Sequence, residues 1–78
     1  MTILTEITVI MTELNLGKII KNHRKIANLS QLKLANLASI GKTTVFDLEK
    51  NKDTVSWKNI KLVLNVLNIK VHFESPIK

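Results

Sequence analysis

Basic side chains are concentrated in the middle of this chain, and their chemistry is that of holding a polyanion. Residues 18 to 61 contain ten lysine and arginine residues against three acidic residues, whereas residues 1 to 17 contain two glutamates and no base. The formal net charge of the 78 residues is +6. A basic block of this size favours nucleic acid or another polyanion as the partner, although a solvated lysine surface would have the same composition.

Residue sets that could catalyse a reaction or bind a metal ion are absent from the sequence. It contains no cysteine, and its two histidines, His23 and His72, are far apart and have no ligand spacing around them. No acid and base are paired, no nucleophile has a partner, and two glycines cannot form a phosphate-binding loop. We therefore expect no enzyme, no cofactor and no metal site, and we interpret His23 as a packed residue at the edge of the core.

The elements that must position the basic residues are two short helices joined by a tight turn, within residues 29 to 52. Ser30 is predicted to cap the first helix, because its hydroxyl can accept from the backbone N–H two or three residues later. Residues 39 to 41 form the turn, and the second helix extends from Lys42 to Lys50. Helices at this spacing in a small basic domain are typical of a helix-turn-helix, which places its second helix in the DNA major groove.

Flanking elements complete a mostly α-helical fold. Apolar residues at helical spacing predict helices over residues 16 to 27 and 57 to 67, with Trp57 as a core anchor. Residues 69 to 74 alternate apolar and polar, which indicates a half-buried strand. Residues 1 to 15 fit either period, and we expect a loosely held arm or a short helix there. The chain thus divides into an arm (1–15), a helical domain (16–67) and a terminal strand (68–75).

The predicted terminal strand needs a partner, because one strand cannot stand alone. The chain offers residues 1 to 15 as an internal partner, and the simplest alternative is the same strand of a second subunit. A core of 78 residues is marginal, and burial across a dimer interface would add to it. We assign dimerisation to four apolar residues: Leu64, Ile69, Val71 and Phe73.

The sequence gives no sign of export or of a membrane partner. Its start has no basic region before the apolar residues, as a signal peptide requires, and no apolar run approaches the ~20 residues of a membrane helix. We expect a soluble, cytoplasmic protein.

Residues 16 to 67 resemble the lambda-repressor-like helix-turn-helix family, also called Xre or Cro/C1-type. The motifs that carry the resemblance are Leu29-Ser30-Gln31, Leu34-Ala35-x-x-Ala38, Ile40, Val45 and Asp47-Leu48-Glu49. The strand directly after the fourth helix is most similar to HipB-type antitoxins, which partner HipA-like kinase toxins. The resemblance implies four helices with a C-terminal strand paired across a dimer. It also implies an antitoxin that binds operator DNA, represses its own operon and binds a HipA-like kinase toxin.

The resemblance also implies which residues contact DNA. Lys42 and Thr43 begin the recognition helix, where lysine can donate to guanine O6 or N7 and threonine can contact a thymine methyl group. Asp47 faces the groove in this register and could accept from a cytosine amine, or instead pair with Lys50 or Lys42. The expected phosphate contacts are Gln31, Thr44, Phe46, Lys50 and Lys52.

One further pair implied by the resemblance is structural. Family members commonly join the position of Arg24 to that of Glu49 by a partly buried ion pair, which orients the recognition helix. The chain departs from the family pattern at three positions, where Ser39 and Asn51 stand in place of glycine and Gly41 in place of a Ser or Thr cap.

Two other functions remain open from the sequence. A stand-alone Xre-type transcriptional regulator would use the same fold without a toxin. A protein-interaction module that has lost DNA binding would account for Gly41 and Asp47, since a weak cap and an acid are unfavourable on a phosphate-facing helix.

Overall fold

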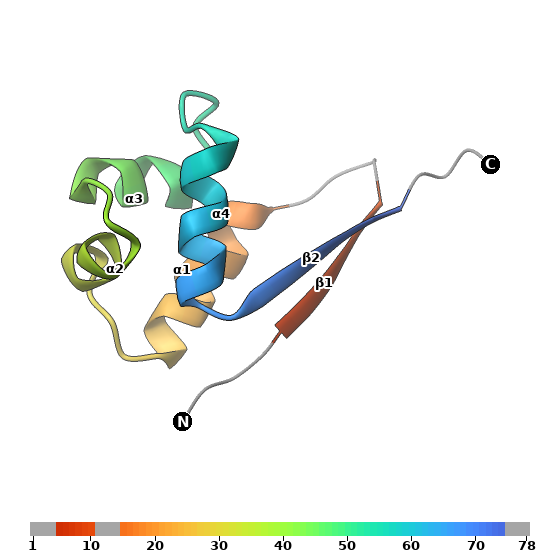
Figure 1. Cartoon of the computed structure of the whole chain (residues 1–78), viewed down its shortest axis with the longest axis horizontal. Coiled ribbons are helices and arrows are strands. Elements are labelled where there is room, and N and C mark those ends of the chain that lie inside the picture. The colour runs from red at the N-terminus through yellow and green to blue at the C-terminus, as the bar shows by residue number, and fades with distance from the viewer. Residues whose placement is uncertain (1–4, 11–14, 75–78) are drawn as a thin grey trace.

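The computed structural model describes residues 5–10 and 15–74, which form four helices and two strands (Figure 1). The order is β1 (Thr5–Ile10), α1 (Leu16–Ile26), α2 (Gln31–Ala38), α3 (Lys42–Glu49), α4 (Trp57–Val66) and β2 (Ile69–Glu74). The predicted mostly α-helical fold with a C-terminal strand is confirmed. The first, third and fourth helices each end one residue before the predicted limit.

The hydrophobic core lies where the four helices meet, and β2 adds one residue to it. Ala35 is fully buried, as expected of a small residue near the crossing of α2 with its neighbours. Each large aliphatic side chain buried here stabilises the fold by about 1.5–3 kcal/mol relative to exposure. The buried apolar residues are Ile20, Leu34, Ala35, Ala38, Val45, Leu48, Val63, Leu64, Leu67 and Ile69.

All four helices are followed by a residue in the left-handed conformation, and none of these residues is glycine. They are Asn28 (φ 61°), Ser39 (φ 59°), Asn51 (φ 59°) and Asn68 (φ 57°). Asparagine tolerates this conformation, because its short polar side chain can bond locally, whereas serine has no such advantage. The start signals are equally local: Ser30 accepts from the Lys33 N–H at 3.0 Å, and Ser56 accepts from the Asn59 N–H at 3.2 Å.

The N-terminal segment differs from the prediction. Residues 5–10 form a strand, so the expected loose arm or short helix is wrong there, while residues 1–4 and 11–14 lie outside the described residues. β1 pairs with β2 in parallel, with Thr5 opposite Ile69 and Ile10 opposite Glu74. The segment is rich in β-branched residues, and the exposed edge of β2 supplies the hydrogen-bonding partner that decides between strand and helix.

This pairing also gives β2 a strand partner within the same chain. Parallel strands need a long crossover connection, and here the whole four-helix domain is that connection. Among the described residues the sheet has two strands, so each strand keeps one edge without a strand partner. Pairing across a dimer therefore stays a prediction, and it is no longer needed to complete β2.

The two helices of the helix-turn-helix are separated from the sheet. Figure 1 shows α2 and α3 on one side of α4, with β1 and β2 on the other. No helix among the described residues is long and apolar enough to cross a membrane.

Trp57 does not anchor the core as predicted. Its exposed fraction is 45%, because α4 directs Val63, Leu64 and Leu67 into the core and Trp57 lies at the first turn, beyond the packed stripe.

Candidate nucleic-acid interface

The turn between α2 and α3 is fixed by backbone hydrogen bonds. The Ser39 N–H donates to the Asn36 carbonyl at 3.2 Å, and the Ile40 N–H donates to the Ala35 carbonyl at 3.0 Å. Gly41 then occupies the N-cap of α3 without a side-chain hydrogen bond. The backbone N–H groups at this helix start are therefore not all used by a cap, which favours an anionic ligand there.

The inner face of α3 is held by Val45 and Leu48, which are buried. Its opposite face is open to solvent. Lys42 and Thr43 are exposed at its N-terminus, and Thr44 is half-buried beside them. Phe46 is 44% exposed, which leaves an aromatic ring on an otherwise polar face. This face therefore combines cationic, hydroxyl and apolar groups on one helix, as a base-reading surface requires.

Two intramolecular contacts involve the remaining residues of this face. The Lys52 Nζ lies 3.4 Å from the Asp47 Oδ1, and the Lys50 Nζ lies 5.4 Å from the centre of the Phe46 ring. Asp47 thus pairs with Lys52. The ion pair with Lys50 or Lys42, predicted as the alternative to a base contact, is wrong. Contacts between such exposed groups contribute under about 1 kcal/mol, so a phosphate group can displace either lysine at low cost.

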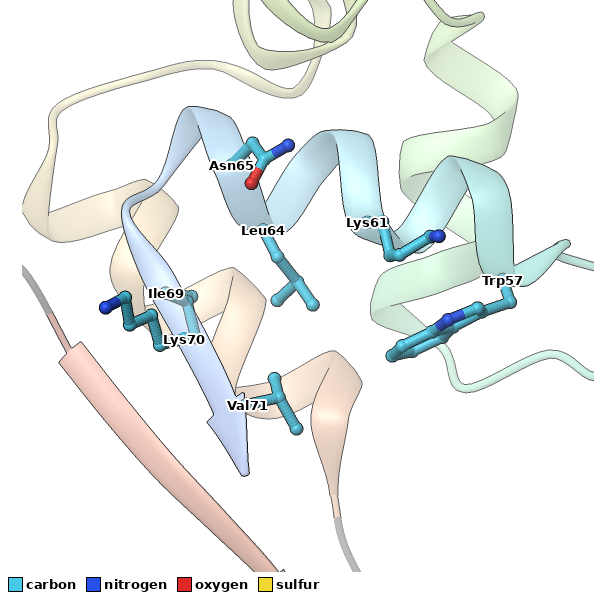
Figure 2. A pocket seen from close by; sticks show the side chains of 7 residues that line it. All are labelled: Trp57, Lys61, Leu64, Asn65, Ile69, Lys70 and Val71. Carbon is cyan, nitrogen blue, oxygen red and sulfur yellow. The ribbon is translucent and has the colours of Figure 1, made fainter. Parts of the chain in front are cut away.

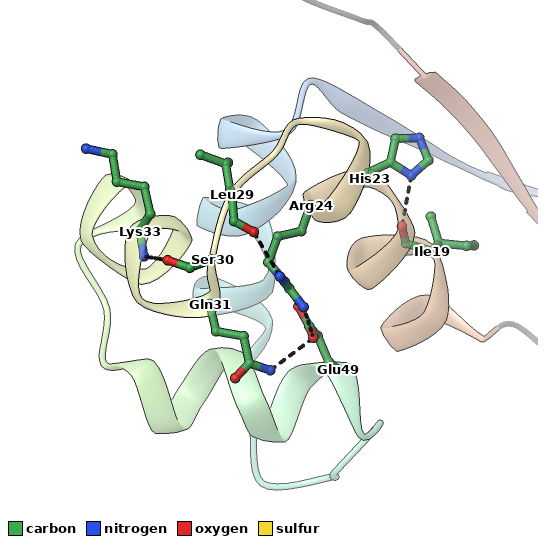
Figure 3. Close-up of polar contacts among 8 residues, drawn as sticks. All are labelled: Ile19, His23, Arg24, Leu29, Ser30, Gln31, Lys33 and Glu49. Carbon is green, nitrogen blue, oxygen red and sulfur yellow. Dashed lines mark hydrogen bonds and ion pairs between the residues drawn. The ribbon is translucent and has the colours of Figure 1, made fainter.

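A buried polar cluster joins α1, α2 and α3 behind the exposed face (Figure 3). The Arg24 Nε donates to the Glu49 Oε2 at 2.6 Å and its Nη2 donates to the Oε1 at 3.1 Å. The two side chains are 10% and 4% exposed. The Arg24 Nη1 also donates to the Leu29 carbonyl at 2.8 Å. This two-point ion pair fixes the C-terminal end of α3 against α1, which is the structural role that the resemblance implies.

Gln31 belongs to the same cluster. Its Nε2 donates to the Glu49 Oε1 at 3.1 Å, so one of its two amide hydrogens is used inside the protein. The side chain is half-buried at the first position of α2. Gln31 therefore extends the Arg24–Glu49 pair to the start of α2, and its contact with a phosphate stays a prediction.

A second contact between α1 and α3 was missed from the sequence. The Gly17 N–H donates to the Asn51 Oδ1 at 2.9 Å, and the Asn51 Nδ2 donates to the Asn15 Oδ1 at 2.8 Å. A Cβ atom at Gly17 would lie 2.6 Å from the Glu49 carbonyl oxygen and 2.7 Å from that of Leu48. The available signal was a glycine inside a helix, which usually marks a close backbone approach.

Some of the residues assigned to dimerisation are buried within the single chain. Leu64 and Ile69 are each 5% exposed within the core, and Val71 is half-buried. The side chain of Phe73 lies outside the described residues. Their role in a dimer stays a prediction.

Comparison with known proteins matches this geometry to a family. The helix-turn-helix family HTH_3 matches residues 20–73, which include α2, α3 and α4 and most of β2. The chain belongs to this helix-turn-helix family. The members are DNA-binding regulators, and the role of α3 as the recognition helix stays a prediction. The resemblance to the Xre-type family is therefore confirmed, while the HipB-type antitoxin likeness stays a prediction.

One solved structure supports the same fold. The chain is similar to a structure titled SinR protein/SinI protein complex, with a TM-score of 0.64 and 28% sequence identity. The similarity covers 70% of this chain and 54% of that chain, so the match spans about half of the solved chain. No curated protein matches the sequence.

Proposed function

We propose that this protein is a sequence-specific repressor that inserts α3 into the major groove of operator DNA. The observation that carries the proposal is the contrast between the two ends of α3. Its N-terminal turn exposes Lys42 and Thr43, while its C-terminal end is fixed by the bidentate Arg24–Glu49 pair. A rigid helix with an open polar face is what direct readout of base edges needs.

The residues divide into two roles in this proposal. Lys42 and Thr43 read bases, and Asp47 accepts from a cytosine amine once Lys52 has turned to a phosphate. The contacts to the DNA backbone position the helix without reading sequence. They come from Gln31, Thr44, Phe46, Lys50 and Lys52.

The test separates these roles by the pattern of lost affinity. An operator is first selected from random duplex DNA, and binding is followed by fluorescence anisotropy of labelled DNA. Lys42→Ala is expected to lower the preference for the selected operator over single-base variants by about 1–3 kcal/mol at the base it reads. Lys50→Ala is expected to weaken all sequences alike and to reduce the salt slope by about 1.

Lys70→Ala is the matched control, because it removes the same charge from an exposed residue of β2, on the far side of α4 from α3. Its operator affinity should change less than that of Lys50→Ala. An unchanged base preference in Lys42→Ala would remove Lys42 from base reading. No binding at low salt would instead support an interaction module that has lost DNA binding.

We further propose that the repressor is an antitoxin for a HipA-like kinase toxin and that it acts as a homodimer. Two observations support this finer role: β2 follows α4 directly, and each strand keeps an edge without a strand partner among the described residues. The similar solved structure is itself a complex of two different proteins. The alternative is a stand-alone Xre-type regulator.

Growth assays distinguish these two possibilities. If the neighbouring gene encodes a kinase-like protein that arrests growth, co-expression of this chain should restore growth, and the two proteins should co-purify. A stand-alone regulator would repress its own promoter and leave growth unchanged. Dimeric binding predicts an operator with two half-sites whose centres lie about one helical turn apart.

A further inference from the structure

Phe46 places an exposed aromatic ring on the outer face of α3. It follows Lys42 by four residues and Thr43 by three, so the three side chains share one face of the helix. Its exposed fraction is 44%. Val45 and Leu48 occupy the opposite, buried face, so the ring has no route into the core. The outer face of α3 therefore carries a large apolar group where a surface helix normally carries polar ones.

A phenyl ring is poorly suited to a phosphate contact, although Phe46 is among the expected backbone contacts. It has no charge and no hydrogen-bond donor, and phosphate groups are bound by cations and donors. The base edges in the major groove present one apolar group, the C5-methyl group of thymine. The other bases present only donors and acceptors there. The ring therefore gains an apolar contact at thymine and at no other unmodified base.

Two lysines flank the ring. Lys42 precedes it by one helical turn, and the Lys50 Nζ lies 5.4 Å from the ring centre. The major groove has the complementary arrangement, with methyl groups on the base edges and phosphate groups along both walls. Lys50 covers the ring in the free protein, so its movement to a phosphate would uncover the ring for a base.

We infer that Phe46 reads the C5-methyl group of a pyrimidine, so that the protein favours thymine over cytosine at one position of its operator. The inference deepens the proposed function and rests on it, because it requires α3 to lie in the major groove. It moves Phe46 from backbone contact to base reading. Since 5-methylcytosine carries the same methyl group, methylation of a cytosine at that position is expected to strengthen binding.

Replacement of thymine by uracil tests the contact, because uracil lacks only the methyl group and keeps the O4 acceptor. Each thymine of the selected operator is replaced in turn, and binding is measured by fluorescence anisotropy. One replacement is expected to weaken binding of the wild-type protein by about fourfold, which corresponds to one buried methyl group. Phe46→Ala should bind that uracil duplex and the thymine duplex equally. Phe46→Leu should keep part of the difference.

A second pair of duplexes adds the methyl group to a different base. Cytosine or 5-methylcytosine is placed at the same position, in each case opposite guanine. The wild-type protein should bind the methylated duplex about fourfold more tightly. Phe46→Ala should not distinguish the two duplexes.

Trp57 and Thr43 provide the matched controls. Trp57 is as exposed as Phe46, at 45%, but it lines the cavity between α4 and β2, and no residue of α3 lines that cavity (Figure 2). Trp57→Ala should therefore keep the fourfold uracil effect. Thr43→Ala removes a methyl-bearing side chain beside Phe46, and it should also keep the effect at that position. Circular dichroism of each variant checks that the helices are retained.

Two results would overturn the inference alone. An equal uracil effect in the wild-type protein and in Phe46→Ala would return the ring to a backbone contact. Loss of the effect in Thr43→Ala but not in Phe46→Ala would assign the methyl group to Thr43. Absence of binding to every duplex would overturn the proposed function as well, whereas operator binding without any uracil effect would overturn only the role of Phe46.

Discussion

At the scale of single residues, the buried ion pair between Arg24 and Glu49 has a large energetic consequence. Both side chains are nine-tenths or more buried, and the carboxylate accepts three hydrogen bonds, two from Arg24 and one from Gln31. Removing one partner from such a pair leaves the other charge buried without compensation, which costs far more than losing an exposed pair.

Glu49→Ala is therefore expected to lower the free energy of unfolding by about 3 kcal/mol. Urea denaturation followed by far-ultraviolet circular dichroism measures this loss. The double variant Arg24→Met/Glu49→Leu should recover a large part of it, because it removes both charges together. A loss below about 1 kcal/mol in Glu49→Ala would mean that the pair behaves as an exposed one.

The residues of this cluster were only partly predictable. Arg24 and Glu49 came from the family resemblance, because nothing in local spacing joins residues so far apart in sequence. The place of Gln31 in the cluster and the partner of Asp47 depend on side-chain positions that exist only after α2 and α3 have packed. The exposed position of Trp57 was missed, because helical spacing shows which residues share a face but not where the core ends.

At the scale of elements, the close approach of α1 to the end of α3 depends on Gly17. At the other glycine of the chain, Gly41, a Cβ would make only an ordinary van der Waals contact, with the Thr44 Oγ1 at 3.9 Å. The two glycines therefore provide a matched comparison of a crowded site with an open one.

Gly17→Ala is expected to lower the free energy of unfolding by about 1–3 kcal/mol, the range for inserting a methyl group into packed structure. It should also weaken operator binding, because α3 must shift to admit the Cβ. Gly41→Ala should cost less, under about 1 kcal/mol, since only the preference for glycine over alanine at an N-cap is lost. Equal losses in the two variants would contradict the role of the close approach.

A second element-scale prediction concerns the turn before the recognition helix. Ser39 adopts a φ of 59° without the tolerance that asparagine has. Ser39→Gly is therefore expected to raise the free energy of unfolding by about 1 kcal/mol. Ser39→Ala keeps the Cβ and should bring no gain. Thermal unfolding of the three proteins side by side tests this, and equal midpoints would show that the turn carries no strain.

The helices were predictable and the first strand was not, for a physical reason. Helix limits depend on local signals, such as the Ser30 and Ser56 caps and the asparagines that follow the helices. These signals can be recognised from the sequence alone. Residues 1 to 15, which include this strand, fit either a helical or a strand period. The conformation of residues 5–10 is decided by β2, which lies at the other end of the chain.

At the scale of the whole molecule, the two-stranded sheet is a small addition to a helical core. Two strands alone are marginally stable in water. Within the described residues the sheet joins the core cluster through β2, where Ile69 is buried and Val71 packs against the cluster. The helical domain should therefore tolerate loss of the β1–β2 pairing better than loss of any helix contact.

Ile7→Pro tests this independence, because Ile7 is opposite Val71 in the centre of the ladder and proline cannot donate a backbone hydrogen bond. We expect the helical circular dichroism signal to be retained, with amide hydrogens of β2 exchanging faster than those of α4. Ile3→Pro, outside the described strand, is the control. Loss of the helical signal in Ile7→Pro would mean that the sheet is required for the fold.

The parallel register also sets an order of events during synthesis. Thr5 pairs with Ile69, so the strand made first has to wait until the four helices and β2 have left the ribosome before it finds its neighbour. The helices, whose contacts are closer in sequence, can assemble in the meantime. Closing the sheet then follows assembly of the helices, and a newly made copy presents an unpaired strand edge to whatever protein is being translated beside it.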